Sequence, residues 1–148
     1  MNSEKKLNNR LNHLYHSIKK RERLRIGDKQ WKIKSAYFWS NKEFKDWYNK
    51  QDKVCNYCKI TEDQLKQIND LVKRHKSKGK IINKRYKTRG ENLEVDRKDD
   101  KVGYNKNNCC LACYWCNNAK TDTFTEEEFK PIGKLIGKIL RNKIGKKR

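Results

Sequence analysis

The 148-residue sequence has few apolar residues, few acidic residues, a single proline and no long hydrophobic run. Hydrophobic residues make up 34% of the chain and charged residues 39%, so the chain cannot build a generous apolar core and needs an additional cross-link. The missing hydrophobic run excludes a transmembrane helix and therefore a membrane partner. The first twenty residues are too polar for the core of a signal peptide, which predicts a protein that stays in the reducing cytoplasm of a bacterial or phage-infected cell.

Acidic residues are scarce in comparison with basic ones. Lys and Arg total 39 and Asp and Glu total 18, which gives a formal net charge of +21. Such an excess repels itself in a compact protein, and it is tolerable when the working partner is a polyanion. A surface that only solubilises a protein normally mixes both signs, so the charge predicts nucleic acid as the partner.

Hydrophobic spacing in the N-terminal stretch predicts an amphipathic helix, which the Gly27-Asp28 pair should interrupt. The apolar face of this helix consists of Leu7, Leu11, Leu14, Tyr15 and Ile18. Its opposite face is basic, and this face is either a solvated surface or an arm that contacts phosphates. We therefore expect residues 1–39 to form a basic helical arm and residues 40–148 to form a separate domain.

Three capping boxes predict where further helices begin. They are Ser40-x-x-Glu43, Thr61-x-x-Gln64 and Thr125-x-x-Glu128. The aromatic residues Phe44, Trp47 and Tyr48 follow the first box at helical spacing and are predicted to be core residues rather than base-stacking groups. The last helix is predicted to bury an apolar face, with Pro131 as the site of a kink. That face comprises Phe129, Ile132, Leu135, Ile136, Ile139 and Leu140.

Two short strands are predicted between these helices. Leu93-Glu-Val95 alternates as a strand does, Lys101–Tyr104 has the composition of a turn with Gly103 supplying flexibility, and Cys109–Cys113 returns as the second strand. A helix should follow Cys116. The order strand, loop, strand and helix makes the predicted fold class α+β.

Six cysteines in a reducing compartment indicate metal ligands or free thiols rather than disulfides. Cys55-x-x-Cys58 and Cys113-x-x-Cys116 are matched knuckles, each placing two thiolates on a tight turn, and together they predict one structural four-sulfur zinc site per chain. Cys109 and Cys110 have no partner at knuckle spacing, so we expect them to be strand residues, one of them buried.

The predicted strand pair and helix should bring Asp96 close to Asn117. A carboxylate and an amide oxygen form a hard oxygen pair that suits Mg²⁺ or Mn²⁺. Such an ion can stabilise the charge that develops during phosphodiester hydrolysis. Asn108, at the base of the second strand, is expected to bridge the loop and strand backbones with its amide, while Asp99 and Asp100 are turn residues or additional metal ligands.

Residues 73–89 carry many basic side chains and no acid. Such a segment cannot pack against itself, so it is either a phosphate-binding loop or hairpin or a disordered connector. We favour phosphate contact, with Lys84, Arg85 and Lys87 as the contacting residues.

The segment from Leu93 to Lys120 resembles the motif of HNH (ββα-metal) nucleases, in which an acidic residue is followed by a base, a structural Asn and a metal-binding Asn or His after a zinc-knuckle Cys. The resemblance implies that Asp96 and Asn117 are the metal ligands and Asn108 is the structural Asn. It also places Lys120 where the family's C-N-x-x-K pattern has a lysine, which we expect to contact a DNA phosphate. The implied fold is a ββα-metal core stapled by the zinc site, with flanking helices.

The sequence departs from the usual motif at Arg97, where most HNH nucleases have a histidine as the general base. The pattern V-D-R, followed by G-Y and L-A-C-x-x-C-N-x-x-K, is similar to a branch of short, rare-cutting restriction endonucleases. That resemblance implies that Tyr104 is the base or positions the water and that Arg97 clamps the phosphate. The alternative base is one of the three histidines, His13, His16 or His75.

These patterns predict a metal-dependent endonuclease that hydrolyses double-stranded DNA, in a restriction, phage or homing role. The alternative is a non-catalytic, zinc-stabilised protein that binds nucleic acid, and a more distant one is a basic structural protein of a ribonucleoprotein. A homodimer would suit an enzyme that cuts a palindrome, because two active sites must then be related by a two-fold axis.

Overall fold

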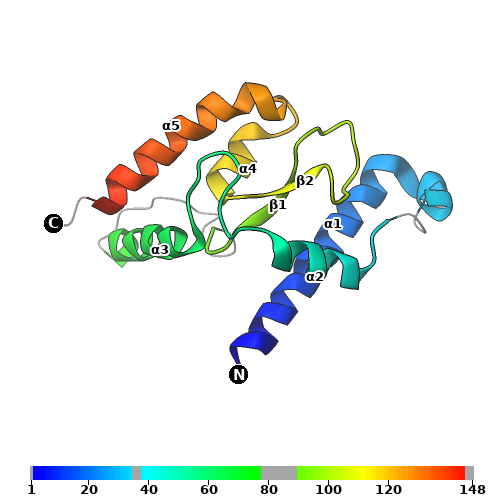
Figure 1. Cartoon of the computed structure of the whole chain (residues 1–148), viewed down its shortest axis with the longest axis horizontal. Helices are drawn as coiled ribbons and strands as arrows, with labels where there is room; N and C mark the ends of the chain where they lie inside the picture. The colour runs from blue at the N-terminus through cyan, green and yellow to red at the C-terminus, as the bar shows by residue number, and fades with distance from the viewer. Residues whose placement is uncertain (1, 35–37, 78–89, 146–148) are drawn as a thin grey trace. The chain divides into compact units, whose positions relative to one another are not determined.

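The structure is a computed structural model of the whole chain. It describes residues 2–34, 38–77 and 90–145, and the side chains of these residues except 33, 34 and 72–77. Along the chain the elements are α1 (Ser3–Lys34), α2 (Asn41–Lys50), α3 (Glu62–Ser77), β1 (Glu94–Arg97), β2 (Cys109–Ala112), α4 (Tyr114–Lys120) and α5 (Glu126–Gly145) (Figure 1). The predicted α+β class is confirmed, since these helices accompany one small two-stranded sheet. Within the described residues no helix is both long enough and apolar enough to cross a membrane.

The chain folds as two compact units. The first joins Met1–Asp52 with Asp100–Cys109, and the second joins Lys53–Asp99 with Cys110–Arg148. The helix that follows Ser40 belongs with the N-terminal helix, because α1 and α2 pack against each other through their apolar faces.

The first unit is held together by aromatic side chains from α1, α2 and the segment between them. Phe44 and Tyr48 are fully buried, and the Phe44 ring lies 6.0 Å from Tyr15 and 5.4 Å from Trp39. Burying a residue of this size contributes about 1.5–3 kcal/mol. The capping box at Ser40 is formed in both directions, which fixes the start of α2. The predicted core role of Phe44 and Tyr48 is thus confirmed.

Helix α1 also holds the loop of the first unit, which contains Tyr104. Glu22 is buried and accepts hydrogen bonds from Arg25 Nη2 at 2.5 Å and from the backbone N–H of Tyr104 at 3.3 Å. Gly103 lies against this pair, and a side chain there would collide with the Glu22 carboxylate. Gly103 thus allows this close approach, because a Cβ there would force the ends of the Glu22 and Arg25 side chains to shift. The predicted interruption of the helix falls at Gly27, where φ is +78°.

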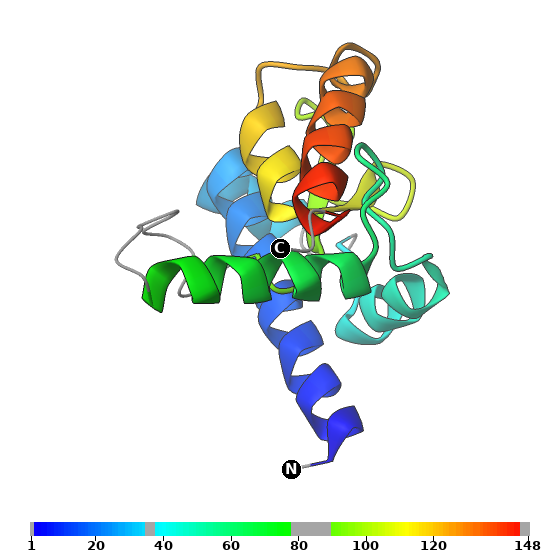
Figure 2. The same ribbon diagram turned by 90° about the vertical axis from the view of Figure 1, so that its left-hand side faces the viewer.

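The second unit contains the sheet, formed by β1 and β2, with α4 packed on β1 and α3 in contact with α5 (Figure 2). The turn Cys55–Lys59 is joined to β2 by a hydrogen bond of 2.8 Å from the Asn56 N–H to the Leu111 carbonyl. The capping boxes at Thr61 and Thr125 are both formed. Helix α4 begins at Tyr114, earlier than the sequence predicted, because Cys113 serves as its N-cap.

Helix α5 packs through a face that the sequence did not predict. Gly133 and Gly137 are buried, and a Cβ at these positions would collide with Tyr57 and with the Cys58 carbonyl, respectively. Phe129 and Leu140 are buried as predicted. Ile132, Leu135 and Ile139 are instead exposed, so the prediction that they belong to the buried face is wrong. The two glycines let the helix lie very close to the turn at Tyr57 and Cys58, so the buried face of α5 is centred on the glycines.

Candidate functional site

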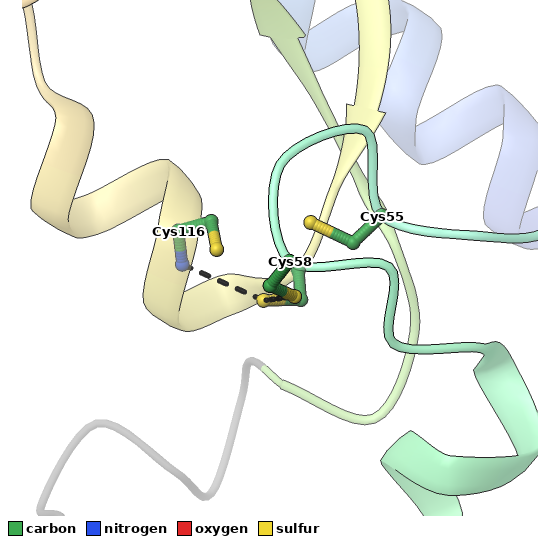
Figure 3. A group of neighbouring side chains, drawn as sticks. Cys55, Cys58 and Cys116 are labelled. Carbon is green, nitrogen blue, oxygen red and sulfur yellow. Dashed lines mark hydrogen bonds between the residues drawn. The ribbon is translucent and has the colours of Figure 1, made fainter. Parts of the chain in front are cut away.

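Four cysteine side chains meet in the second unit. The ligand atoms of Cys55, Cys58, Cys113 and Cys116 all lie within 4.8 Å of one another, and all four residues are buried. Figure 3 shows the sulfurs of Cys55, Cys58 and Cys116 directed toward a common centre from the turn and from α4. The Sγ atoms of Cys58 and Cys113 are 3.6 Å apart, and none of the four forms a disulfide. The two knuckles that are matched in the sequence are therefore brought together by the fold.

This cluster could hold a metal ion. Tetrahedral coordination by thiolates with metal–sulfur bonds of about 2.3 Å requires sulfurs about 3.8 Å apart, and the Cys58–Cys113 pair is close to that separation. Hydrogen bonds from Cys113, and then from Cys116 and Cys58, hold the pKa of the Cys55 thiol well below its usual range. The neighbouring thiols, Cys113 first, raise the pKa of Cys116. One thiolate is thus favoured by the cluster alone, while full deprotonation requires a bound cation, which the residues are placed to hold.

A second group of polar side chains connects β1 and α4. Successive strand residues alternate between faces, so Glu94 and Asp96 share a face of β1, while Asn117 and Lys120 share a face of α4. The residues meet in pairs: Asn117 Nδ2 donates to Glu94 Oε2 at 2.6 Å, and Lys120 Nζ lies 3.6 Å from Asp96 Oδ2. The fold thus places both predicted ligands of the catalytic ion in one strand–helix contact.

Asp96 lies in a mostly buried environment with hydrogen-bond donors around it. The Tyr57 hydroxyl donates to Asp96 Oδ2 at 2.7 Å. Burial raises the pKa of the Asp96 carboxyl, against the opposing effects of the Tyr57 hydrogen bond and then the Lys120 charge. Burial, followed by the charges of Cys110 and Asp96, holds the pKa of Tyr57 far above its usual range, so the hydroxyl remains a donor. A divalent cation beside Asp96 would favour the ionised carboxylate further.

The donor set in this region suits a hard cation. Asp96 offers a carboxylate oxygen, and the Asn117 amide, whose nitrogen is committed to Glu94, directs its oxygen away from that contact. Oxygen ligands of this kind are those that Mg²⁺ and Mn²⁺ prefer. The chemistry of these residues therefore fits such an ion.

The structure assigns Lys120 a role that differs from the sequence prediction. Its side chain is 1% exposed, and its ammonium donates to the Arg97 carbonyl at 2.9 Å. A buried amine with two internal partners is not available to a DNA phosphate, so the predicted phosphate contact is corrected to an internal one between α4 and β1. Arg97 itself is half-buried at the end of β1.

The remaining predicted site residues lie elsewhere. Tyr104 and Asn108 belong to the first unit. The Asn108 amide donates to the Val102 and Gly103 carbonyls at 3.0 and 3.1 Å, so both of these acceptors lie in the loop before β2. Lys84, Arg85 and Lys87 lie outside the described residues.

Cys109 and Cys110 are both buried in β2 and take no part in the four-cysteine cluster. Burial raises the pKa of Cys110 to about 12, so this thiol remains protonated and behaves as a small apolar side chain. Both residues are strand residues, as predicted.

Sequence reasoning missed three partners of the predicted site residues: Tyr57 beside Asp96 and Glu94 beside Asn117 in the second unit, and Glu22 beside Tyr104 in the first. Glu94 had a usable signal, because it lies two positions before Asp96 in a strand and therefore on the same face. Tyr57 and Glu22 had none, since their contacts with Asp96 and Tyr104 join residues 39 and 82 positions apart.

Comparison with known proteins gives one informative likeness. No family model and no curated protein sequence matches the chain. The structure is similar to that of an HNH restriction endonuclease, with 28% sequence identity and a TM-score of 0.52 over 72% of this chain and 67% of the other. That enzyme is PacI, a rare cutter whose structure was solved in a study of how it perturbs DNA. The resemblance to HNH endonucleases that the sequence predicted is thereby confirmed.

Proposed function

We propose that the protein is a metal-dependent endonuclease that hydrolyses phosphodiester bonds in double-stranded DNA. The observation that carries the proposal is the contact between β1 and α4, in which Asn117 meets Glu94 and Lys120 meets Asp96. The same chain has a four-cysteine cluster and is similar to an HNH restriction endonuclease. In this proposal β1, β2 and α4 form the ββα-metal core, and one zinc ion bound by the cysteines holds that core to the turn at Cys55 and Cys58.

The proposed roles divide the chemistry among a few side chains. Asp96 and Asn117 hold Mg²⁺ or Mn²⁺, which when bound supplies positive charge to the phosphate and the leaving oxygen. Glu94 fixes the Asn117 amide, and Lys120 joins α4 to the end of β1. Arg97 binds the phosphate and stabilises the charge that develops on it. Tyr104 is assigned the base or water-positioning role by resemblance alone.

Removing the Tyr104 hydroxyl tests that assignment. We expect Tyr104→Phe to lower the cleavage rate by about 10²- to 10⁴-fold, the usual contribution of general acid–base catalysis, without changing zinc content. Single-turnover cleavage of a labelled duplex measures the effect. Tyr15→Phe, which removes another buried hydroxyl from the first unit, is the matched control. A Tyr104→Phe protein that cleaves at the wild-type rate would transfer the role to His13, His16 or His75, to be tested singly.

DNA binding should be dominated by phosphate contacts. The outer face of α1 exposes several cations, which are Lys5, Lys6, Lys19, Lys20 and Arg21. Affinity should fall steeply with salt, with a log–log slope of about −0.9 for each neutralised phosphate. Such a slope would indicate that the basic residues bind a nucleic-acid substrate and do not merely make the surface soluble.

Replacing Lys84, Arg85 and Lys87 with Ala should make the salt dependence shallower. If all three contact phosphates, the slope should change by about 2.7, which is three times the contribution of one phosphate. Fluorescence anisotropy of a labelled duplex over a salt series measures it. Alanine at the exposed Lys42 and Lys50 of α2 is the control for general loss of charge. A slope unchanged by the triple replacement would assign those charges to ordinary solvated surface.

The competing function is a zinc-stabilised protein that binds nucleic acid without cutting it. It is favoured by one observation, the arginine at position 97 where the usual base is histidine. Supercoiled plasmid incubated with zinc-loaded protein and Mg²⁺ or Mn²⁺ separates the two functions. We expect nicked or linear products that disappear when EDTA removes the exchangeable ion, provided that the cysteine-bound zinc is retained. Binding without any product would establish the alternative.

A further inference from the structure

Tyr57 lies inside the first zinc knuckle, between Cys55 and Cys58, and its ring is tightly held. Its side chain is 1% exposed. The Phe129 ring packs edge-on against it, with centroids 5.1 Å apart and planes at 90°. On the side of α5, Gly133 approaches so closely that an added Cβ would collide with the Tyr57 Cβ. The position of the Tyr57 hydroxyl is therefore set by the knuckle and by α5.

That hydroxyl contacts the carboxylate that the proposed function assigns to the catalytic ion. Tyr57 Oη donates to Asp96 Oδ2 at 2.7 Å, and Lys120 Nζ lies 3.6 Å from the same oxygen. The two donors come from separate elements, the knuckle and α4, and both side chains are almost fully buried. The Tyr57 hydrogen bond and the Lys120 charge act on the same oxygen, and together they restrict the rotation of the carboxylate.

We propose that Tyr57 is a positioning residue that transmits the geometry of the zinc knuckle to the Asp96 carboxylate. The inference rests on the proposed function, because it concerns the site that would hold Mg²⁺ or Mn²⁺. It gives the cysteine cluster a role beyond stability: the zinc-bound turn fixes the hydroxyl, and the hydroxyl fixes the metal ligand. Partners of this kind typically contribute a factor of about 10 to 100 in metal affinity or activity.

The test replaces Tyr57 with Phe, which keeps the ring against Phe129 and removes only the donor. Mn²⁺ affinity of the zinc-loaded protein is measured by electron paramagnetic resonance, together with zinc content and the absorption spectrum of the Co²⁺-substituted cysteine site. We expect Mn²⁺ to bind about 10- to 100-fold more weakly, while zinc content and the Co²⁺ spectrum remain those of the wild type. The Mn²⁺ concentration for half-maximal cleavage should rise by the same factor.

Tyr48→Phe is the matched control, since Tyr48 is equally buried and its hydroxyl accepts a hydrogen bond from Arg10 in the first unit. It should leave Mn²⁺ affinity unchanged. Mn²⁺ binding to Tyr57→Phe within twofold of the wild type would overturn the inference and leave the proposed function intact. Loss of zinc in Tyr57→Phe would also overturn it, because the hydroxyl would then be needed for zinc binding by the four cysteines. A wild-type protein that neither binds Mn²⁺ through Asp96 nor cleaves DNA would refute the proposed function itself.

Discussion

Replacing Cys113 with Ser should unfold the second unit or leave it with only residual structure. Zinc binding to four-cysteine sites contributes on the order of 10 kcal/mol to folding, comparable with the whole stability of a small domain. Cys113 Sγ lies 3.6 Å from Cys58 Sγ and accepts a hydrogen bond from the Cys116 N–H, so its loss removes a ligand and the cap of α4. Circular dichroism during denaturant unfolding and elemental zinc analysis measure the result.

Cys110→Ser is the matched control for that experiment. Cys110 is equally buried and lies in β2, but it is not part of the four-cysteine cluster. We expect this variant to keep its zinc and to lose only the cost of a buried hydroxyl, about 1–3 kcal/mol. The proposed structural zinc site would be refuted if wild-type protein contained no zinc, or if Cys113→Ser unfolded at the same denaturant concentration as the wild type.

Replacing Asp96 with Asn should abolish cleavage, with a loss of at least about 10³-fold, because the charged ligand of the catalytic ion is removed. Asn is preferred to Ala here. Asp96 is the ion-pair partner of the buried Lys120. Truncation to Ala would leave that buried ammonium without its counter-charge, which would lower the folding stability by about 3–5 kcal/mol. Asn also removes the charge, but its amide oxygen can still accept from Tyr57 and Lys120, and Lys120 keeps the Arg97 carbonyl as a partner, so the cost should be smaller than with Ala and the fold should survive.

The matched control is Asp63→Asn. Asp63 pairs with Lys66 at 2.7 Å, and its side chain is 82% exposed, so the pair is worth at most about 1 kcal/mol and has no link to the site. Single-turnover cleavage, zinc content and DNA affinity are compared for the three proteins. An Asp96→Asn protein that retains zinc and binds DNA but cleaves at more than a tenth of the wild-type rate would contradict the assigned role.

The parts of the molecule that the sequence predicted are those governed by short-range rules. The capping boxes at Ser40, Thr61 and Thr125 formed as expected, because a side chain three residues from a helix start has little choice of partner. Each Cys-x-x-Cys knuckle supplies only two of the four ligands that a tetrahedral metal site needs, so the sequence predicted that the two knuckles would lie together, as they do.

The parts that sequence reasoning missed depend on contacts between distant segments. The face that α5 buries is set by Gly133 and Gly137, whose lack of a side chain carries no hydrophobic signal. Lys120 has the charge of a phosphate ligand, but its burial follows from how closely α4 packs on β1. The place of Asp100–Cys109 in the first unit also depends on a distant contact, since this loop meets α1 where the Tyr104 N–H donates to Glu22.

The dependence of the cleavage rate on Mn²⁺ concentration, at constant zinc content, tests the central claim most directly. Wild-type protein should show no cleavage of supercoiled plasmid without added Mn²⁺ and a rate that rises to saturation as Mn²⁺ is added. Asp96→Asn, with the same zinc content and DNA affinity, should remain inactive over the whole range. Cleavage that persists without an exchangeable divalent ion, or a saturation curve that Asp96→Asn reproduces, would contradict the account.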